Sequence, residues 1–185
     1  RSHRRVMVLE TMGRASGDLA RMGALASGAE MVITPEPGPL TEEGMQELAA
    51  QIEGAMTRGR GHAIVLVAEG VAFDPPQARN RAYVLMDAFQ RYFQRPGAPF
   101  NDLEVRPSVL GHLQRGGHTT PQDCILAARF AEAAWKVIVD PQGANGITAL
   151  RHNRVEVVPF GSAPMPERAE MSADMDRLHQ DLSNW

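Results

Sequence analysis

Cysteine is almost absent from this chain: Cys124 is the only one among 185 residues. One cysteine excludes an internal disulfide and is typical of a reducing compartment, which predicts a cytoplasmic protein. No apolar run approaches the roughly 18 residues that a membrane-spanning helix needs, and no signal peptide is recognisable. We expect Cys124 to be buried and inert, although the first turn of a helix generally favours a thiolate.

The chain also has no large excess of charge of either sign. Its formal net charge is −3, and 43% of its residues are hydrophobic. This composition excludes a disordered chain and argues against a nucleic-acid partner, because proteins that bind nucleic acids carry a basic excess. A chain of this length can bury a core of its own.

Recognisable metal and nucleotide motifs are missing too. No His and Cys residues have the spacing of zinc ligands. No Gly-x-x-x-x-Gly-Lys sequence provides a phosphate-binding loop of the Walker type. No internal repeat or low-complexity segment is present. Evidence of function must therefore come from short glycine-containing segments.

Leu110–Gly117, with the sequence Leu-Gly-His-Leu-Gln-Arg-Gly-Gly, is the most informative segment. Its glycines allow the backbone to approach a ligand. Arg115 offers a planar charged group that suits phosphate, and His112 adds a second donor. Thr120 and Pro121 then begin an expected helix, whose N-terminus favours anions. The segment is either a sugar-phosphate contact site or an ordinary strand–turn–helix connection with an exposed arginine.

A second turn of this kind follows the apolar run Val6–Leu9, which we expect to be a buried strand. Residues Glu10–Asp18 contain two glycines and Arg14, and a helix is expected from there to Gly28. Ligands of open α/β sheets bind at the carboxyl ends of strands. The two turns therefore predict two walls of one anion site. Alternatively, the glycines serve turn geometry alone and Arg14 is a solvated charge.

Strands and helices are expected to alternate along most of the chain. This order predicts an α/β fold, with a mostly parallel sheet covered by helices on both faces. We assign residues 1–160 to one domain, with a long connection at 74–102, and residues 161–185 to a helical tail. Further strands are expected at 31–33 and 62–68, helices at 40–56 and 77–93, and a hairpin at 147–150 and 155–158.

Several of these segments resemble, in the same order, the motifs of the 6-phosphofructokinase family. Glu10–Ala20 is similar to that family's Met-Gly-Arg region, and Leu110–Gly117 to its Leu-Gly-His-Ile-Gln-Arg-Gly-Gly sequence. The resemblance covers roughly residues 2–150 and corresponds to the C-terminal half of a bacterial-type subunit. It implies a phosphofructokinase-like fold. Shorter matches lie at 28–30, 35–36, 62–65 and 68–70.

The resemblance implies a binding site for fructose 6-phosphate. Met12, Gly13 and Arg14 match the turn that contacts this sugar phosphate. Arg14 would be the catalytic residue, since it would lie near the transferred phosphoryl group. Glu69 matches a carboxylate that accepts hydrogen bonds from sugar hydroxyls. Taken alone, Glu69 is a carboxylate after an apolar run and is also compatible with a loop cap.

Four further positions complete the implied substrate site. His112 and Arg115 match the pair that binds the phosphate ester and hydroxyls. Arg5 and Arg106 match two arginines that reach a neighbouring subunit's site and hold its 6-phosphate. The resemblance therefore implies a homo-oligomer, a tetramer or a dimer. Taken singly, Arg5 is also compatible with a solvated basic patch, and Arg106 is unremarkable.

An effector site between subunits is a further implication, because bacterial phosphofructokinases bind a regulatory nucleotide or phosphoenolpyruvate there. Within it, Glu30 matches a carboxylate linked to a metal ion. Arg58 and Arg60 are equally compatible with a role in complementing the dipole of the preceding helix. The matching positions are Gly28, Ala29, Glu30, Arg58, Arg60 and His62.

The family's reaction phosphorylates the 1-hydroxyl of fructose 6-phosphate in glycolysis, using ATP and Mg²⁺. Its Gly-Gly-Asp-Gly donor motif and Thr-Ile-Asp-Asn-Asp base motif lie upstream of the matched region, and neither occurs in this sequence. We expect a fragment that holds mainly the sugar-phosphate side and is inactive alone, with Mg²⁺ and ATP (or pyrophosphate) bound by an upstream half. The alternatives are a pyrophosphate-dependent phosphotransferase and a non-catalytic, sugar-phosphate-binding regulatory subunit.

Overall fold

The computed structural model describes residues 4–140, 143, 145–160, 175 and 177–179. The chain falls into two compact units, one formed by Arg1–Gly116 with Ala169–Trp185 and the other by Gly117–Arg168. The boundary predicted after residue 160 stays a prediction, since most of the expected tail helix lies outside the described residues. In the part that is described, no helix is both long and apolar enough to cross a membrane.

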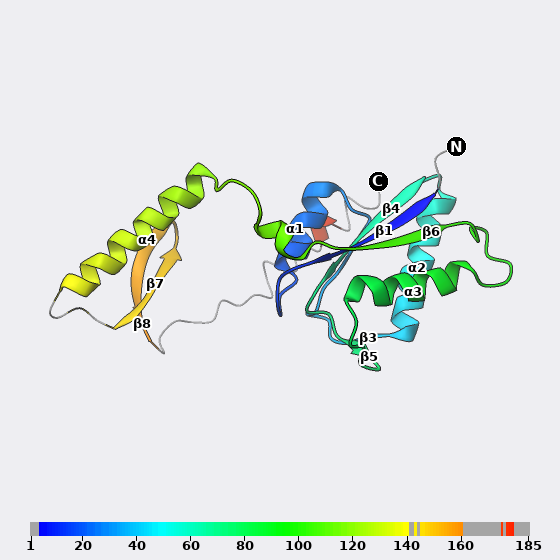
Figure 1. Ribbon diagram of the computed structural model, residues 1–185, viewed down its shortest axis with the longest axis horizontal. Helices are drawn as coiled ribbons and strands as arrows, with labels where there is room; N and C mark the ends of the chain where they lie inside the picture. Colours follow the sequence, from blue (N-terminus) through cyan, green and yellow to red (C-terminus); the bar gives the residue numbers. More distant parts are fainter. Residues whose placement is uncertain (1–3, 141–142, 144, 161–174, 176, 180–185) are drawn as a thin grey trace. The chain divides into compact units, whose positions relative to one another are not determined.

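A four-stranded sheet forms the centre of the first unit (Figure 1). Its strands stand in the order β2-β4-β1-β6, and every neighbouring pair is parallel. The prediction of an α/β fold with a mostly parallel sheet is therefore confirmed. The strands are β1 (Arg5–Thr11), β2 (Met31–Ile33), β4 (His62–Ala68) and β6 (Glu104–Val109).

Three helices cover the two faces of this sheet, as predicted. α2 and α3 pack against each other and enclose the main core, in which Phe89 and Phe93 are fully buried. α1 packs on the other face, over a smaller cluster of Ala24, Ala29 and Leu66. The helices are α1 (Asp18–Ser27), α2 (Glu42–Thr57) and α3 (Arg81–Phe93).

The first helix begins and ends where the sequence predicts. α1 ends where Gly28 adopts a left-handed conformation, with φ of 66°, which favours glycine. Its large apolar side chains do not form the buried face: Leu19 and Met22 are 53% and 58% exposed. Ala24 and Arg21 are buried instead, because the small alanine lets the helix lie close to the sheet and Arg21 has polar partners.

The second helix begins slightly later than predicted. Leu40 and Thr41 form β3 (Leu40–Thr41), which pairs in parallel with β5 (Phe73–Asp74) as a separate two-stranded sheet. Thr41 is then the N-cap of α2, and its hydroxyl accepts the backbone N–H of Gly44 at 3.1 Å. The predicted helix is therefore confirmed, and only its first residue differs.

The third helix begins at Arg81 rather than at the predicted Gln77. Its first turn is capped from β1, because the Glu10 carboxylate accepts the backbone N–H of Ala82 at 3.1 Å and the side-chain amide of Asn80 at 3.3 Å. This cap comes from a residue far away in the sequence. Local sequence patterns therefore could not place the helix start.

The second unit contains a helix, α4 (Pro121–Val139), and an antiparallel hairpin of β7 (Gly146–Arg151) and β8 (Arg154–Pro159). The predicted hairpin is confirmed. The predicted helix start is confirmed as well, because the Thr120 hydroxyl accepts the N–H of Asp123 at 3.2 Å while the Asp123 carboxylate accepts the N–H of Thr120 at 3.1 Å. This reciprocal capping box ties the helix start to its own sequence.

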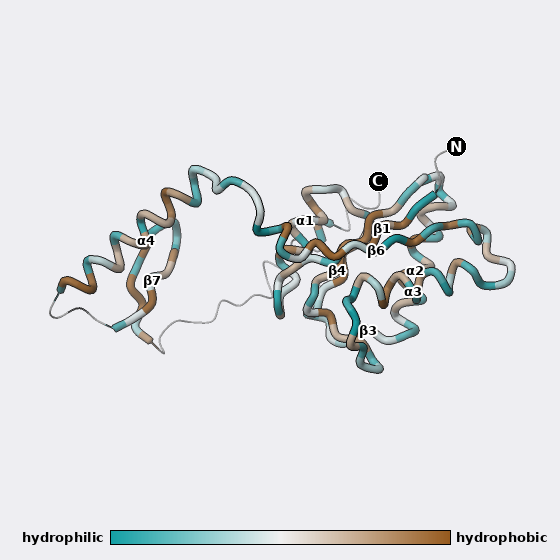
Figure 2. Tube along the Cα trace, in the orientation of Figure 1, coloured by the Kyte–Doolittle hydropathy of each residue, from teal (hydrophilic) through white to brown (hydrophobic). Residues whose placement is uncertain are grey.

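The expectation that Cys124 is buried is wrong, since its side chain is exposed. No residue of α4 is buried among the described residues, and Trp135 and Ile138 are 64% and 74% exposed. A single helix beside one hairpin leaves most of its surface open, which explains both observations. Figure 2 shows apolar segments along α4 as well as along the central strands.

Candidate functional site

The backbone of the Met12–Arg14 turn is held by two side chains from other segments. The N–H of Met12 donates to Gln114 Oε1 at 2.7 Å. The N–H groups of Gly13 and Arg14 donate to Glu69 Oε1 at 3.1 and 2.7 Å. Three predicted segments thus meet at the carboxyl ends of β1, β4 and β6, as expected for a ligand site of a parallel sheet.

The shape of this turn requires glycine at Gly70. A Cβ atom built on Gly70 would lie 2.1 Å from the Arg14 carbonyl oxygen, closer than any stable contact. Arg14 itself adopts a φ of 55°, which is uncommon for a residue with a side chain. Backbone contacts with Glu69 and Gly70 therefore fix the point from which the Arg14 side chain extends.

The segment that contains Gln114 is η1 (Gly111–Arg115), a short 3₁₀ helix after β6. The N–H of Leu110 donates to the Glu10 carbonyl at 3.0 Å, which joins the segment to β1. Within the described part of the chain, the exposed side chains of His112 and Arg115 make no hydrogen bond or ion pair, and the same holds for Arg14. Their donors are available to an anion.

Glu69 has spare hydrogen-bonding capacity. Its Oε1 is occupied by the turn, and no described group donates to its Oε2. Its own backbone N–H donates to the Thr11 carbonyl at 2.9 Å, so the residue stays in line with the end of β1. The half-buried carboxylate can hold the turn with one oxygen and accept a ligand hydroxyl with the other.

Arg5 and Arg106 are not brought to this end of the sheet. Arg5 is the first residue of β1, and the turn follows its last residue, so about 23 Å of extended chain separates them. Glu104 binds both arginines, through Arg5 Nε at 3.0 Å and Arg106 Nε at 2.7 Å. Hydrogen bonds from Arg106, and then from Arg5, hold the pKa of Glu104 below its usual value.

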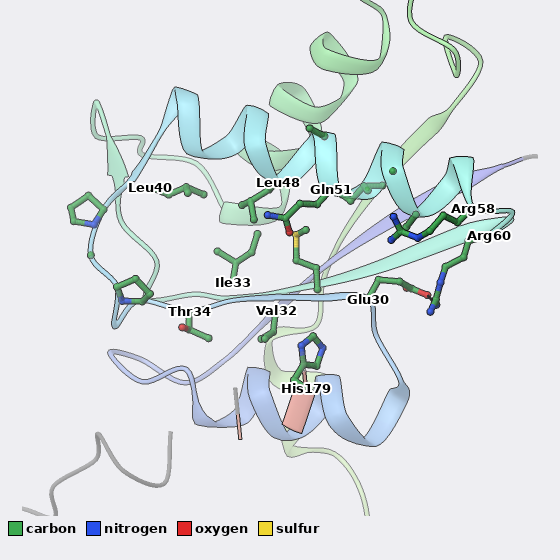
Figure 3. Close-up of a pocket in the computed structure, with 18 residues that line it drawn as sticks. Glu30, Val32, Ile33, Thr34, Leu40, Leu48, Gln51, Arg58, Arg60 and His179 are labelled. Atoms are coloured by element: carbon green, nitrogen blue, oxygen red, sulfur yellow. Dashed lines mark hydrogen bonds and ion pairs between the residues drawn. The ribbon is translucent and has the colours of Figure 1, made fainter. Parts of the chain in front are cut away.

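Three of the six positions matched to an effector site, Glu30, Arg58 and Arg60, line a cavity of about 910 Å³ beside β2 and α2 (Figure 3). Glu30 accepts hydrogen bonds from Arg60 Nη1 and from the N–H of Ile64, both at 2.6 Å. Arg60 is therefore neutralised by Glu30. Arg58 has no described partner, and Figure 3 shows it next to Arg60 at one end of the cavity.

The remaining positions matched to the effector site lie in two different places. Gly28 and Ala29 line a smaller hollow of about 130 Å³ beside Glu30, whereas His62 is exposed at the start of β4. The sequence analysis missed His179, which lines both cavities and lies 2.9 Å from the Ala29 carbonyl oxygen. Nothing in the sequence near His179 indicated this contact.

An ion pair between the buried Arg21 and the partly exposed Glu36 supports the segment after the turn, and the sequence analysis missed it as well. Arg21 is 3% exposed and donates to Glu36 Oε2 at 3.1 Å and to the Thr34 hydroxyl at 3.0 Å. Glu36 also accepts the N–H of Gly17 at 2.7 Å. Burial would raise the pKa of Glu36, but the bonds from Arg21 and Gly17 outweigh it and lower that pKa to about 2.

These features define an open parallel α/β protein with a braced, cationic turn at the carboxyl ends of its strands. The family model for phosphofructokinase matches residues 1–138, and the chain belongs to the phosphofructokinase family. The family expected from the sequence is thus confirmed.

Its relatives include ATP-dependent 6-phosphofructokinases. The chain is 34% identical to that of Staphylococcus carnosus (strain TM300) over 182 residues, which covers 98% of this chain and 50% of that protein. It is 36% identical to that of Tolumonas auensis over 154 residues, or 83% of this chain and 42% of that protein. The chain spans about half the length of the curated relatives it matches, which fits the expected half of a subunit.

Solved structures agree with this assignment. Phosphofructokinase from Saccharomyces cerevisiae matches with a TM-score of 0.68 and 25% identity, covering 99% of this chain and 22% of that chain. Pyrophosphate-dependent phosphofructokinase from Nitrosospira multiformis matches with a TM-score of 0.65 and 24% identity, covering 90% and 43%. The second match establishes the shared fold only.

Proposed function

We propose that the protein is a 6-phosphofructokinase, which transfers a phosphoryl group from ATP to the 1-hydroxyl of fructose 6-phosphate, and that this chain supplies the sugar-phosphate side of the site. The observation that carries the proposal is the meeting of the Met12–Arg14 turn with Glu69 and Gln114, beside cationic side chains without described partners. Relatives named ATP-dependent 6-phosphofructokinase support ATP as the donor.

The sugar phosphate would be held by groups of complementary chemistry. Glu69 accepts a sugar hydroxyl with its Oε2, while its Oε1 keeps the turn in place. Arg115 and His112 donate to the phosphate ester and to hydroxyl oxygens, and hydrogen bonds between charged partners are the strongest available. Met12 and Gly13 contribute the backbone surface of the turn against which the sugar lies.

Arg14 would act on the reacting group itself. Phosphoryl transfer depends mainly on positioning and on stabilising negative charge. A guanidinium held at a fixed distance from the transferred group stabilises that charge without reorganising in the transition state. The constraint that Gly70 and Glu69 place on the Arg14 backbone supports this role.

The phosphoryl donor and its metal ion need a binding site of their own. The described residues contain no cluster of three or more His, Cys, Asp or Glu that suits a metal ion. As the family resemblance implies, Mg²⁺ and ATP (or pyrophosphate) would bind mainly to the half of the subunit that precedes the matched region, which would also supply the catalytic base. A comparison of ATP with pyrophosphate distinguishes the two possible donors.

Assembly and regulation extend the proposal. Arg5 begins β1, and Arg106 lies on β6 opposite Met7, so both are away from the turn that follows β1. This position suits a role in a neighbouring subunit's site and hence a homo-oligomer, a tetramer or a dimer. The cavity with Arg58 at one end would take a nucleotide or phosphoenolpyruvate effector. The cytoplasm is the compartment that fits this glycolytic role.

The test is a coupled assay of fructose 1,6-bisphosphate formation by the full-length protein that carries this chain. ATP and pyrophosphate are compared as donors, and binding of fructose 6-phosphate is measured in parallel by calorimetry. Turnover with ATP is the expected result. Turnover with pyrophosphate but not with ATP would identify pyrophosphate as the donor. Binding without turnover by either donor supports a regulatory subunit, and the absence of both binding and turnover overturns the proposal.

A further inference from the structure

Parallel pairing of β1 with β6 brings two arginines to one carboxylate. Arg5 lies opposite Glu104 in the register, and Arg106 lies two residues further along the same strand. Glu104 Oε2 accepts a hydrogen bond from Arg5 Nε at 3.0 Å, and Glu104 Oε1 accepts one from Arg106 Nε at 2.7 Å and forms an ion pair with Arg106 Nη2 at 2.6 Å. Each carboxylate oxygen thus serves a different arginine.

The carboxylate occupies only part of each guanidinium group. Arg5 is bound through Nε alone, and Arg106 through the edge formed by Nε and Nη2. A guanidinium has five N–H donors in a fixed plane. Both arginines therefore keep terminal donors that no described residue uses, and the three side chains together carry one net positive charge. An anion can bind without displacing Glu104.

Two opposing effects of Glu104 on such an anion can be compared. Its negative charge repels a phosphate, but all three side chains are 41–51% exposed, and solvent screens charges at such sites strongly. Its hydrogen bonds hold two long, flexible, mutually repelling side chains in place. Binding by planar guanidinium groups depends on geometry. Removing Glu104 would therefore weaken phosphate binding, because the disordering of the two arginines outweighs the relief of charge repulsion.

We propose that Glu104 is a positioning residue, which holds Arg5 and Arg106 as one preformed pair for the 6-phosphate of fructose 6-phosphate. The inference rests on the proposed function, because only there do the two arginines bind phosphate. Glu104 touches neither the substrate nor the reacting atoms. It acts through the orientation of the two guanidinium groups.

The experiment uses the full-length protein with Glu104→Ala and Glu104→Gln, and measures the Kd of fructose 6-phosphate, KM and kcat. We expect Glu104→Ala to weaken binding 5- to 20-fold while kcat and the KM of the phosphoryl donor stay within twofold. Glu104→Gln keeps one acceptor oxygen, and so one arginine, and an intermediate loss is expected. Glu42→Ala, which removes an ion pair with Arg91 on α2 and α3, is the matched control and leaves binding unchanged.

Each other outcome overturns the inference. Tighter binding in both Glu104 variants would mean that charge repulsion dominates, and unchanged binding would mean that the arginines need no support. If Glu104→Ala does not fold, the affinity of Glu104→Gln for fructose 6-phosphate decides: weaker binding than in the wild type supports the inference, and equal or tighter binding overturns it. Wild-type protein that neither binds nor converts fructose 6-phosphate overturns the proposed function and this inference together, whereas wild-type binding with unaffected variants removes Glu104 alone.

Discussion

The side chain of Gln114 accepts the backbone N–H of Met12 at 2.7 Å, a link between residues 102 positions apart in the chain. It joins the turn after β1 to the 3₁₀ helix after β6. Together with Glu69, it leaves no N–H group of the three-residue turn unpaired. The backbone of the turn is thus held in place by side chains of the same chain.

Gln114→Ala removes this brace and leaves the Met12 N–H without its partner. We expect kcat/KM for fructose 6-phosphate to fall about tenfold, which corresponds to about 1.4 kcal/mol for one lost hydrogen bond. Steady-state kinetics of the full-length protein measure the change. Gln46→Ala, on the exposed side of α2, is the control. Equal kinetics of the two variants would show that the turn holds its shape without Gln114.

Gly70→Ala introduces a Cβ atom 2.1 Å from the Arg14 carbonyl oxygen. The turn has to move, and we expect kcat to fall at least about 100-fold, or about 2.7 kcal/mol of transition-state stabilisation. The control is Gly61→Ala, because nothing lies within 4 Å of a Cβ atom at that position. Retained activity in Gly70→Ala would separate Arg14 from catalysis.

Arg115→Ala removes a cation that has no described partner other than solvent. Loss of a charged hydrogen bond should weaken fructose 6-phosphate binding by about 1.5–3 kcal/mol. Calorimetric titration measures the affinity. Arg91→Ala, which breaks only an exposed ion pair with Glu42, should bind as the wild type does. Unchanged affinity in Arg115→Ala removes this residue from the site.

The lowered pKa of Glu36 predicts that the fold loses stability in acid. Its pKa falls from 4.5 in the reference state to about 2 in the fold, so its contribution is complete above about pH 4.5 and disappears as the pH falls toward 2. Because its side chain is 36% exposed, solvent screening limits the contribution to about 1–2 kcal/mol.

Urea unfolding of the wild type and of Glu36→Gln measures this contribution. The difference between their free energies of unfolding should be largest near pH 6 and should vanish near pH 2. A difference that does not vary with pH would assign the effect to packing rather than to the carboxylate. Glu43→Gln, an exposed residue with no described ion pair, is the control.

Local signals account for the features that the sequence predicted well. Thr41, Thr120 and Gly28 mark helix ends because a cap or a left-handed residue acts within one turn of the chain. Strand β4 is recognisable because a strand buried between two layers is almost continuously apolar. The family motifs around Arg14 and Arg115 are likewise contiguous in sequence.

The sequence by itself determined the fold class, the family and most of the strands and helices, since each depends on residues close together in the chain. Only the tertiary structure decided that Glu10 starts α3, that Glu69 and Gln114 brace one turn, and that Glu104 holds Arg5 and Arg106. Apart from Glu104 and Arg106, which lie two residues apart in β6, these contacts join segments that are 55 to 102 residues apart in sequence. Such contacts depend on which strands and helices become neighbours in the folded chain, and residues close together in sequence do not specify this.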